Sequence, residues 1–524
     1  MKMTRKEFLR ASAAAAGTAL IAGGTTGAST AKAADVTATR SQGQMTLIKG
    51  AKILSMDPKL GDIYGGDVLI DGMKIAEVGH NIDAPNADQV DATDMILMPG
   101  MCDGHRHLWE STAVDRRDFT LVTWHMMYAV AMKPEDVYDY CYLGGKMAID
   151  SGVTRVIDEA HVNHTPEKME ASIRGAIASG VGGVNCPRLC GQVSYGPGDT
   201  VEYKKANDIR IGRGTDWHFE LAEKLRDELF SDSEAPLQFG LAHLNSENGA
   251  VPLEQVHADI ARAWALEPVM MMGVIFGEYM GNSELRTVPD LIKAGLIREN
   301  YIVGHGNGIT NDELLMLRDV GAGVGSTPRA EVRMNKPSPI ARCFKVGCPV
   351  AMGWDHMSYC NLDYFEHIRY AEDHMWANYG ENKEIAKTMN ARDLMHIATL
   401  GGAKAMGMDS KVGSITPGKL ADLVLLRTDR LGFAHIDDLA ERVETFAGIS
   451  DIDSVWVQGK LEKKNGELVD FDKGMFERVN NHWVDTVRPD GKTIKFIGED
   501  GKILTQEQIQ SPYLMPMRPP PPTA

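Results

Sequence analysis

The sequence has few cysteines and a shortage of positive charge, and each absence excludes a class of protein. Its 524 residues include seven cysteines, an odd number without paired CxxC spacing, so neither a disulfide framework nor a cysteine-rich zinc site is indicated. Two close pairs, Cys186 with Cys190 and Cys343 with Cys348, would be able to form disulfides in an oxidising compartment. Lysine and arginine total 55 against 72 acidic residues, giving a net charge of -17, which argues against nucleic acid or an anionic membrane as the main partner.

Long apolar runs are also scarce, and the one near the N-terminus is typical of an export signal rather than a membrane anchor. A basic stretch precedes a run of small and apolar residues over 11–22, and Ala31-Lys32-Ala33 offers an A-x-A cleavage site. The segment around Arg5-Lys6 resembles a twin-arginine signal with lysine in place of the second arginine, which leaves the twin-arginine and general secretory routes open. We expect residues 1–33 to be removed and the mature protein to lie in a bacterial periplasm or outside the cell, without a membrane partner.

The remaining composition describes a globular chain with more than one module. Hydrophobic residues make up 43%, which is enough for a large core, and the length fits one large barrel plus a smaller domain. Residues 34–97 contain short alternating runs separated by glycine turns, which indicates hairpins, and residues 409–470 have the same character. We expect these two segments to form one β-sandwich. Residues 471–524 are a polar C-terminal extension whose proline-rich end we expect to be extended and poorly ordered.

Between these segments, residues 98–408 alternate between short apolar runs and helical patterns. Eight such alternations over nearly 300 residues favour an α/β fold of the (β/α)₈ TIM-barrel type over an open sheet. The expected strands are 96–102, 153–158, 181–186, 237–242, 268–275, 301–304, 322–326 and 349–353.

Two histidines at the end of the first expected barrel strand are the strongest chemical signal. His105 and His107 are two residues apart, so on extended backbone both imidazoles point to the same side, as a metal ion with nitrogen ligands requires. The alternative is two histidines in an exposed loop. Catalytic groups of such barrels follow the strands, and the polar residues in those positions are Glu159 and His161, His243, Glu278, His305 and Asp355.

The order of five motifs resembles the amidohydrolase superfamily, in the branch that contains cytosine and guanine deaminases and triazine chlorohydrolases. The motifs cover roughly residues 46–465 and are Pro99–His107, Gly304-His305, Ser326-Thr327-Pro328, Gly353-Trp354-Asp355 and Gly413–Leu423. The resemblance implies a divalent metal ion that activates water, with zinc as the first expectation and iron or manganese as alternatives. It also implies that His105, His107 and Asp355 are metal ligands, that Asp355 is the general base, and that His305 is an electrophile or fourth ligand.

The fifth expected strand departs from the family pattern. Where the family places a metal-binding histidine, this chain has Met272-Gly273, and a thioether is a poor ligand for such ions. Either the metal is kept by a substitute ligand, for which His243, His305 and Glu278 are candidates, or the site binds metal weakly or not at all. The missing histidine makes deamination of a nucleobase less expected than for the family as a whole.

These patterns together predict an exported, metal-dependent amidohydrolase acting on a small molecule. It would cleave a C–N bond of an amide, cyclic amide, urea or amino-substituted ring, with Asp355 and His305 catalytic. Supporting roles in the pocket are expected for Glu159, His161, His243, Glu278 and Trp109, whose ring lies in a long insertion and would stack on a flat substrate. The alternatives are hydrolysis of a lactone or carbon–halogen bond, and a metal-poor barrel that binds a small molecule without turnover. Homo-oligomers are common in this superfamily.

Overall fold

The computed structural model describes most of the chain after the N-terminal segment. The described residues are 44–111, 129, 132–189, 200–202, 215–243, 247, 252–279, 282–333, 336–357, 361–377, 380–487 and 495–504. The predicted export signal and the proline-rich end both lie outside them. In the described part, no helix has the length and apolar content needed to cross a membrane.

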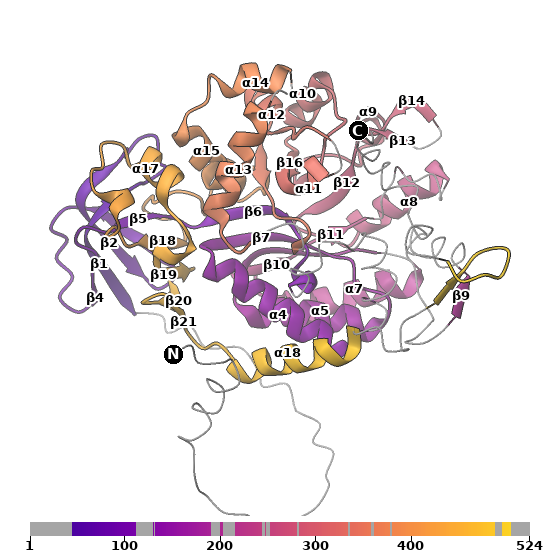
Figure 1. Cartoon of the computed structure of the whole chain (residues 1–524), viewed down its shortest axis with the longest axis horizontal. Coiled ribbons are helices and arrows are strands. Elements are labelled where there is room, and N and C mark those ends of the chain that lie inside the picture. Colours follow the sequence, from indigo (N-terminus) through magenta and orange to yellow (C-terminus); the bar gives the residue numbers. More distant parts are fainter. Residues whose placement is uncertain are drawn as a thin grey trace, which may run out of the picture. The chain divides into compact units, whose positions relative to one another are not determined.

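Eight parallel strand positions form a closed barrel at the centre of the described chain (Figure 1). They are β6 (Met101–Arg106), β7 (Val153–Ala160), β8 (Gly182–Pro187), β10 (Leu237–Phe239) with its continuation β11 (Leu241–Ala242), β12 (Met271–Ile275), β15 (Tyr301–His305), β16 (Gly323–Ser326) and β17 (Val350–Met352). Isolated parallel bridges from Arg106 to Asp355 and from Arg188 to Ala242 join the two hydrogen-bonded halves. The TIM barrel predicted from the eight alternations is therefore confirmed.

Helices follow the barrel strands, and several begin at the residues that the sequence marks as starts. They are α4 (Pro134–Asp150), α5 (Pro166–Ser179), α7 (Asp216–Leu229), α8 (Leu253–Trp264), α9 (Thr287–Lys293), α10 (Asn311–Asp319), α11 (Pro328–Arg333), α12 (Ile340–Val346) and α13 (Tyr364–Trp376). Helix α10 has a capping box, in which the Glu313 amide donates to Thr310 Oγ1 and the Thr310 amide donates to the Glu313 carboxylate. Each reciprocal bond satisfies an amide that the helix itself leaves unpaired. A hairpin of β13 (Glu278–Tyr279) and β14 (Asn282–Arg286) separates β12 from α9.

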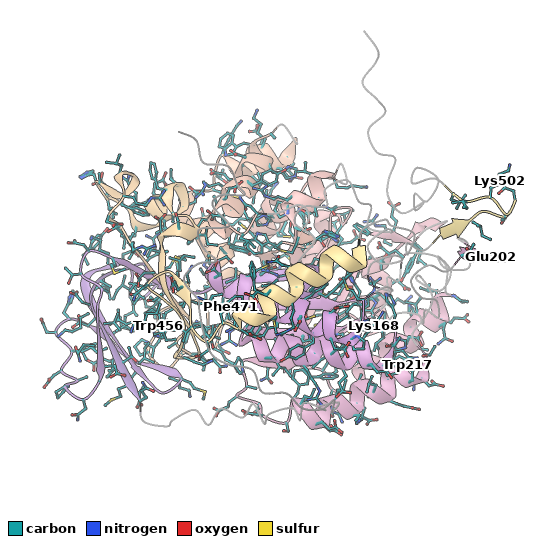
Figure 2. The ribbon with its side chains drawn as sticks, turned by 60° about the horizontal axis from the view of Figure 1, so that its bottom comes forward. Lys168, Glu202, Trp217, Trp456, Phe471 and Lys502 are labelled. Carbon is teal, nitrogen blue, oxygen red and sulfur yellow. The ribbon has the colours of Figure 1, made fainter. Side chains whose placement is uncertain are left out.

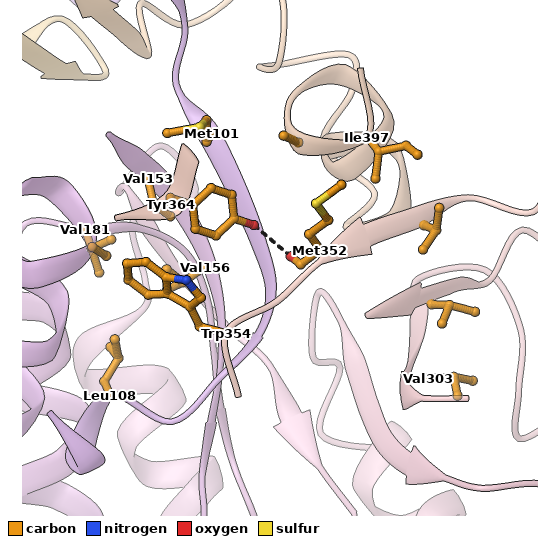
Figure 3. Close-up of a cluster of buried hydrophobic side chains, with 14 of the residues drawn as sticks. Met101, Leu108, Val153, Val156, Val181, Val303, Met352, Trp354, Tyr364 and Ile397 are labelled. Atoms are coloured by element: carbon orange, nitrogen blue, oxygen red, sulfur yellow. Dashed lines mark hydrogen bonds between the residues drawn. The ribbon is translucent and has the colours of Figure 1, made fainter. Parts of the chain in front are cut away.

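A cluster of large buried side chains fastens the first barrel strand to the last (Figure 3). Tyr364 is fully buried and its hydroxyl lies 2.8 Å from the carbonyl oxygen of Cys102 on β6 and 3.0 Å from that of Met352 on β17. Trp354 packs against the Tyr364 ring, and the Arg106 guanidinium lies 4.6 Å from the centre of the Trp354 ring. This packing fixes the spacing of the two strands that lead to His105 and to Asp355.

The two ends of the chain combine in a separate sheet, as predicted. Its nine strands are β1 (Met45–Ile53), β2 (Ile63–Asp71), β3 (Lys74–Gly79), β4 (Asp88–Asp91), β5 (Ile96–Pro99), β18 (Leu423–Leu426), β19 (Ile452–Val457), β20 (Lys460–Lys464) and β21 (Glu467–Leu468). Strand β18 pairs antiparallel with β5 and so joins the N-terminal strands to the C-terminal ones. The sheet curls around its own core because Ile75 on β3 exchanges backbone hydrogen bonds with Gly418 and Lys419, which precede β18.

The sheet domain is joined to the foot of the barrel by a buried ion pair. Arg155 on β7 donates from Nε and Nη2 to the Asp422 carboxylate at 2.6 and 2.9 Å, and the Gln458 amide donates to the same carboxylate at 2.8 Å. The third guanidinium nitrogen donates to the Pro236 carbonyl at 2.8 Å. Every charged atom of this pair therefore has a partner, which is the condition under which a buried ion pair is tolerated.

Four further helices lie between the barrel and the C-terminal extension. Helices α14 (Glu381–Ala386), α15 (Ala391–Ala398) and α16 (Leu400–Ala405) follow the barrel, and α17 (Leu439–Phe446) lies within the C-terminal half of the sheet domain. Buried Cys186, Cys343 and Cys348 are free thiols, so the described structure has no Cys343–Cys348 disulfide, and Cys190 lies outside the described residues.

The C-terminal extension contains regular structure before its undescribed end. Helix α18 (Lys473–Val487) continues from the sheet domain, and Arg478 pairs with Asp139 of α4 at 3.2 Å. Strand β22 (Lys495–Ile497) pairs in parallel with β9 (Thr200–Glu202), and Figure 2 shows this small sheet projecting near Glu202 and Lys502. Neither helix α18 nor this strand pairing was predicted, and the three-residue strands carry no periodic signal in the sequence.

Candidate metal centre

The ends of β6 and β17 bring His105, His107 and Asp355 together. The Asp355 amide donates to the His105 carbonyl at 2.8 Å, so the segment after β17 continues alongside the end of β6. Gly353 allows this close approach, because a Cβ atom there would lie 2.7 Å from the His105 carbonyl oxygen. Asp355 then has φ 57°, in the left-handed region that non-glycine residues rarely adopt, which turns its side chain out of the strand direction.

The donor atoms of these side chains lie at separations typical of ligands that share one ion. His107 Nε2 lies 3.0 Å and His105 Nε2 lies 3.4 Å from Asp355 Oδ1. Ligands about 2.0–2.1 Å from a tetrahedral ion are roughly 3.3 Å apart. The ligand atoms of His105, His107 and Glu159 all lie within 4.8 Å of one another, and so do those of His105, His305 and Asp355.

Two buried groups at this point have polar atoms that no hydrogen bond satisfies in the described structure. Both ring nitrogens of His105 and both carboxylate oxygens of Glu159 are such atoms. Leaving a buried polar atom unpaired costs about 1–3 kcal/mol, so a cluster of four calls for a binding partner. A divalent cation with nitrogen and oxygen ligands fits this donor set.

A hydrogen bond at His107 Nδ1 determines that Nε2 is the nitrogen that faces the cluster. His107 Nδ1 donates to the Glu159 carbonyl oxygen at 2.7 Å, so Nε2 is the nitrogen directed at Asp355, to which it donates at 3.0 Å in the absence of a metal ion. A backbone acceptor behind a metal-binding imidazole is the usual arrangement in metalloproteins, because it holds both tautomer and ring orientation.

The neighbouring charges in the cluster lower the pKa of Asp355 and raise that of His107. Burial raises the pKa of Asp355, but the neighbouring His105, His107 and His305 outweigh it and hold the pKa well below its usual value. Burial lowers the pKa of His107, but Glu110, Asp355 and Glu159 raise it to about 10. Without a cation the carboxylates thus hold a proton on His107, and a bound divalent ion would take the place of that proton.

His305 lies beside the cluster at the end of β15. Its Nε2 lies 3.9 Å from Asp355 Oδ2, its Nδ1 lies 2.8 Å from Thr327 Oγ1, and the Phe276 ring stacks on it with centroids 5.4 Å apart. Burial lowers the pKa of His305 to about 4, so this imidazole is neutral near pH 7. The sequence-predicted position of His305 at the mouth agrees with this geometry.

Glu159 and His161, both predicted as pocket residues, also lie at the centre. Glu159 Oε2 lies 3.9 Å from His105 Nε2, while Oε1 lies 3.6 Å from Arg188 Nε. Burial raises the pKa of Glu159, but Arg188 and the surrounding histidines lower it below the usual value, so the carboxylate is charged. The His161 ring lies 3.9 Å from that of His107 and extends the cluster by one imidazole.

Three predicted site residues lie elsewhere or act differently. Glu278 is exposed on the β13–β14 hairpin and pairs with Arg286 at 2.8 Å, so its proposed role as a substitute ligand is not supported. Trp109 is fully buried and its Nε1 donates to His161 Nδ1 at 2.9 Å, so its ring does not present a face for stacking on substrate.

His243, the third of these residues, is held on the barrel wall. Its Nε2 lies 2.5 Å from the Tyr301 hydroxyl, which occupies the nitrogen that a metal would need. A Cβ atom on Gly273 would lie 2.1 Å from His243 Nε2 and 2.2 Å from Tyr301 Oη. The space beside the fifth strand is therefore already filled by the His243–Tyr301 pair.

Two groups at the site were not identified from the sequence. Glu110 is fully buried, 3.5 Å from His356 Nε2 and 3.9 Å from His161 Nε2, and burial raises its pKa well above the usual value. Its position three residues after His107 was an available signal. Glu331 accepts from the Thr327 amide at 2.7 Å and so orients the residue that contacts His305.

Comparisons with known proteins identify proteins that are similar to this chain. A model of the amidohydrolase family matches residues 276–461. The chain is 26% identical to a 5'-deoxyadenosine deaminase from Methanothermobacter thermautotrophicus, with 80% of this chain and 94% of the relative covered. It is 27% identical to a 5-methylthioadenosine/S-adenosylhomocysteine deaminase from Pyrococcus furiosus, with 78% and 93% covered.

Solved structures with the same fold include several that contain zinc. An adenosine deaminase from Xanthomonas campestris with bound zinc has a TM-score of 0.70 at 20% identity, with 84% of this chain and 98% of that chain covered. An atrazine chlorohydrolase from Arthrobacter aurescens complexed with zinc has a TM-score of 0.65 at 18% identity, with 84% and 100% covered. At these identities the likeness establishes the fold.

Proposed function

This chain belongs to the amidohydrolase superfamily, and from that premise we propose that it is a metal-dependent hydrolase that cleaves a C–N bond of a small molecule. The observation that carries the proposal is the convergence of His105 and His107 with Asp355, which follows His107 by 248 residues, at ligand-like separations of 3.0–3.4 Å. Three donors brought together by two barrel strands form the kind of open site that hydrolytic metal centres use.

The residues around the cluster have separate tasks in this reaction. A divalent ion held by His105, His107 and Asp355 would supply activation of water and neutralisation of developing negative charge. Asp355 is charged and has a second oxygen facing His305, so it accepts the proton that the attacking water loses and returns it to the leaving nitrogen.

His305 is the electrophilic partner. Because burial keeps it neutral, it contributes a hydrogen bond rather than a full charge, and Thr327 fixes its ring. The stacked Phe276 ring limits its movement on the other side. His161 lies against His107, and this contact supports a role for it in the substrate pocket.

The substrate class rests on the relatives. Those named as deaminases act on adenosine derivatives, so an amino-substituted heterocycle is the first class to test, followed by amides, cyclic amides and ureas. A lactone or carbon–halogen substrate at the same pocket, and binding without turnover, remain the competing outcomes of that test.

The test begins with metal analysis of purified mature protein. We expect about one divalent ion per chain, loss of hydrolysis on treatment with a chelator, and recovery when zinc, manganese or iron(II) is returned, measured as ammonia or amine release over the substrate panel. Turnover confined to lactones or halogenated rings would replace the C–N assignment. Absence of bound metal together with substrate binding that a chelator leaves unchanged would establish the non-catalytic barrel.

Export is part of the same proposal. The basic N-terminal stretch and the A-x-A site at residues 31–33 support cleavage before Ala34. Fractionation of bacterial cells that express the full chain should place the protein in the periplasm, and mass spectrometry should give a mature N-terminus near Ala34. Full-length protein confined to the cytoplasm would overturn this part alone.

A further inference from the structure

The fifth barrel strand offers a thioether rather than an imidazole beside His105, because Met272 packs into the barrel interior there: a Cβ atom on Gly304 would lie 3.0 Å from both Met272 Cε and His105 Nδ1. Gly273 lies on β12, paired with Val303 of β15, and the atoms that a Cβ would meet there belong to His243 and Tyr301. The 2.5 Å contact between His243 Nε2 and the Tyr301 hydroxyl makes this pair a fixed part of the wall. One position of the cluster must therefore be supplied by another strand or be left empty.

Glu159, at the end of β7, has the position and chemistry to supply it. Its Oε2 faces His105 Nε2 at 3.9 Å, and its Oε1 faces Arg188 Nε at 3.6 Å. The Glu159 side chain is buried, with 1% exposure, and neither carboxylate oxygen has a hydrogen bond. The same residue holds His107 through its backbone carbonyl at 2.7 Å, so its main chain and side chain both face the cluster.

We propose that Glu159 is a metal ligand that replaces the histidine absent from the fifth strand. The proposal rests on the proposed function, because it assumes that the cluster holds a divalent ion. The ligands are then His105, His107, Asp355 and Glu159, two imidazoles and two carboxylates, with His305 left for the substrate. Arg188 balances one Glu159 oxygen and leaves the other directed at His105.

This substitution changes the preference of the site for metals. Two carboxylates neutralise a divalent ion, whereas one carboxylate with three imidazoles leaves a net positive charge. Oxygen ligands favour harder ions, so manganese and iron(II) should compete with zinc better here than at a histidine-rich site. The identity of the fourth ligand thus bears directly on which metal the chain takes up.

The test measures metal affinity rather than turnover. Metal-free full-length mature protein is titrated with Zn²⁺ and Mn²⁺ in competition with a chromogenic chelator, and with Co²⁺ followed by its visible absorption, which reports the coordination geometry. We expect Glu159→Gln to weaken Zn²⁺ binding more than about 100-fold, beyond the effect of losing an outer partner, and to change the Co²⁺ spectrum. Glu159→Asp, which keeps a carboxylate, should lie between the two.

Glu110→Gln is the matched control. Glu110 is another fully buried carboxylate near His107 but does not belong to either group of converging ligands, so its loss should change Zn²⁺ affinity much less and leave the Co²⁺ spectrum unaltered. Equal weakening by Glu110→Gln and Glu159→Gln would show a general effect of charge and overturn the proposal.

Two other results separate this proposal from the proposed function. If the parent protein binds metal and Glu159→Gln binds it within about threefold while His305→Gln does not, then His305 is the fourth ligand, and the inference fails although the hydrolase assignment stands. If the parent binds none of the three ions, both fail together. Thermal unfolding of each metal-free variant shows whether it is folded, and Glu159→Asp provides the second reading if Glu159→Gln is not.

Discussion

Strand β7 carries a buried charged group at each end, and the two differ in how completely they are paired. At the foot of the barrel, Arg155 and Asp422 satisfy each other at 2.6 and 2.9 Å, with the Gln458 amide and the Pro236 carbonyl as additional partners. At the mouth, Glu159 and His105 are equally buried, but the polar atoms of their side chains have no hydrogen bonds in the described structure. Complete pairing is typical of a group that supports the fold, and incomplete pairing indicates a place where something else binds.

The largest expected effect is at the mouth, where a substitution should reduce activity far more than stability. Asp355→Asn removes the proposed base and one ligand, so we expect kcat/KM to fall at least about 10³-fold. The free energy of unfolding of the metal-free protein should fall less than at the Arg155–Asp422 pair, because Glu110 and Glu159 still offset the charge of His107. Steady-state kinetics and urea unfolding measure the two quantities, and Asp429→Asn, at an exposed position, is the control. A large loss of stability with activity retained would reverse the assignment.

The opposite result is expected at the foot of the barrel. Asp422→Asn leaves Arg155 buried without its anionic partner, which should cost about 3–5 kcal/mol of the free energy of unfolding. Turnover per folded molecule should remain close to that of the parent, because the pair is distant from the histidine cluster along β7. A loss of turnover without a loss of stability would contradict the structural role of the pair.

Buried neutral histidines away from the metal centre predict the response to acid. Burial lowers the pKa of His367 to about 3, and its Nε2 donates to the Gly353 carbonyl at 2.9 Å. Because the folded pKa lies below the unfolded value of about 6.5, the stability is present above pH 6.5 and is lost as pH falls from there toward 3.

At pH 5 this single histidine accounts for about 2 kcal/mol of lost stability. His367→Gln should therefore reduce, by about that amount, the difference between the unfolding free energies at pH 7 and pH 5. The exposed His435→Gln should leave the difference unchanged. An unaltered pH dependence in His367→Gln would show that His367 is not held neutral by the fold.

The smallest expected effect concerns the join between β6 and β17. Tyr364→Phe removes the hydroxyl that contacts the Cys102 and Met352 carbonyls, and the expected loss is about 1 kcal/mol of the free energy of unfolding. Tyr64→Phe, at a half-exposed position, is the control and should change stability less. Equal effects of the two substitutions would assign no special role to the Tyr364 contact.

The sequence predicted those parts of the site that depend on strand position alone. His105 and His107 were identified because alternate residues of a strand share a face, and Asp355 and His305 because each follows an apolar run that ends at the mouth. The same reasoning placed Glu278 at the pocket. It was wrong because a hairpin after β12 carries that residue to the surface, where Arg286 pairs with it.

Properties that depend on contacts between strands could not be predicted from one sequence. The closeness of Glu159 to His105 depends on the register of β7 against β6, and the filling of the space at Gly273 depends on side chains from two other strands. Trp109 has a side chain that would be able to stack on a flat substrate, but its indole nitrogen donates a hydrogen bond to His161 and its ring is fully buried. No local pattern distinguishes these outcomes.

Arg155 and Glu159 are four residues apart on one strand, and this gives the ion pair at the foot a further consequence. A shift of β7 by two residues would keep its inward and outward faces but would separate Arg155 from Asp422 and draw Glu159 away from His105 in the same movement. The sheet domain, through Asp422, thus fixes the register of the strand on which the metal centre depends. A barrel truncated after residue 408 would lack Asp422 and so lose this constraint on the register of β7. The loops at the mouth, in contrast, can vary in sequence without disturbing that register.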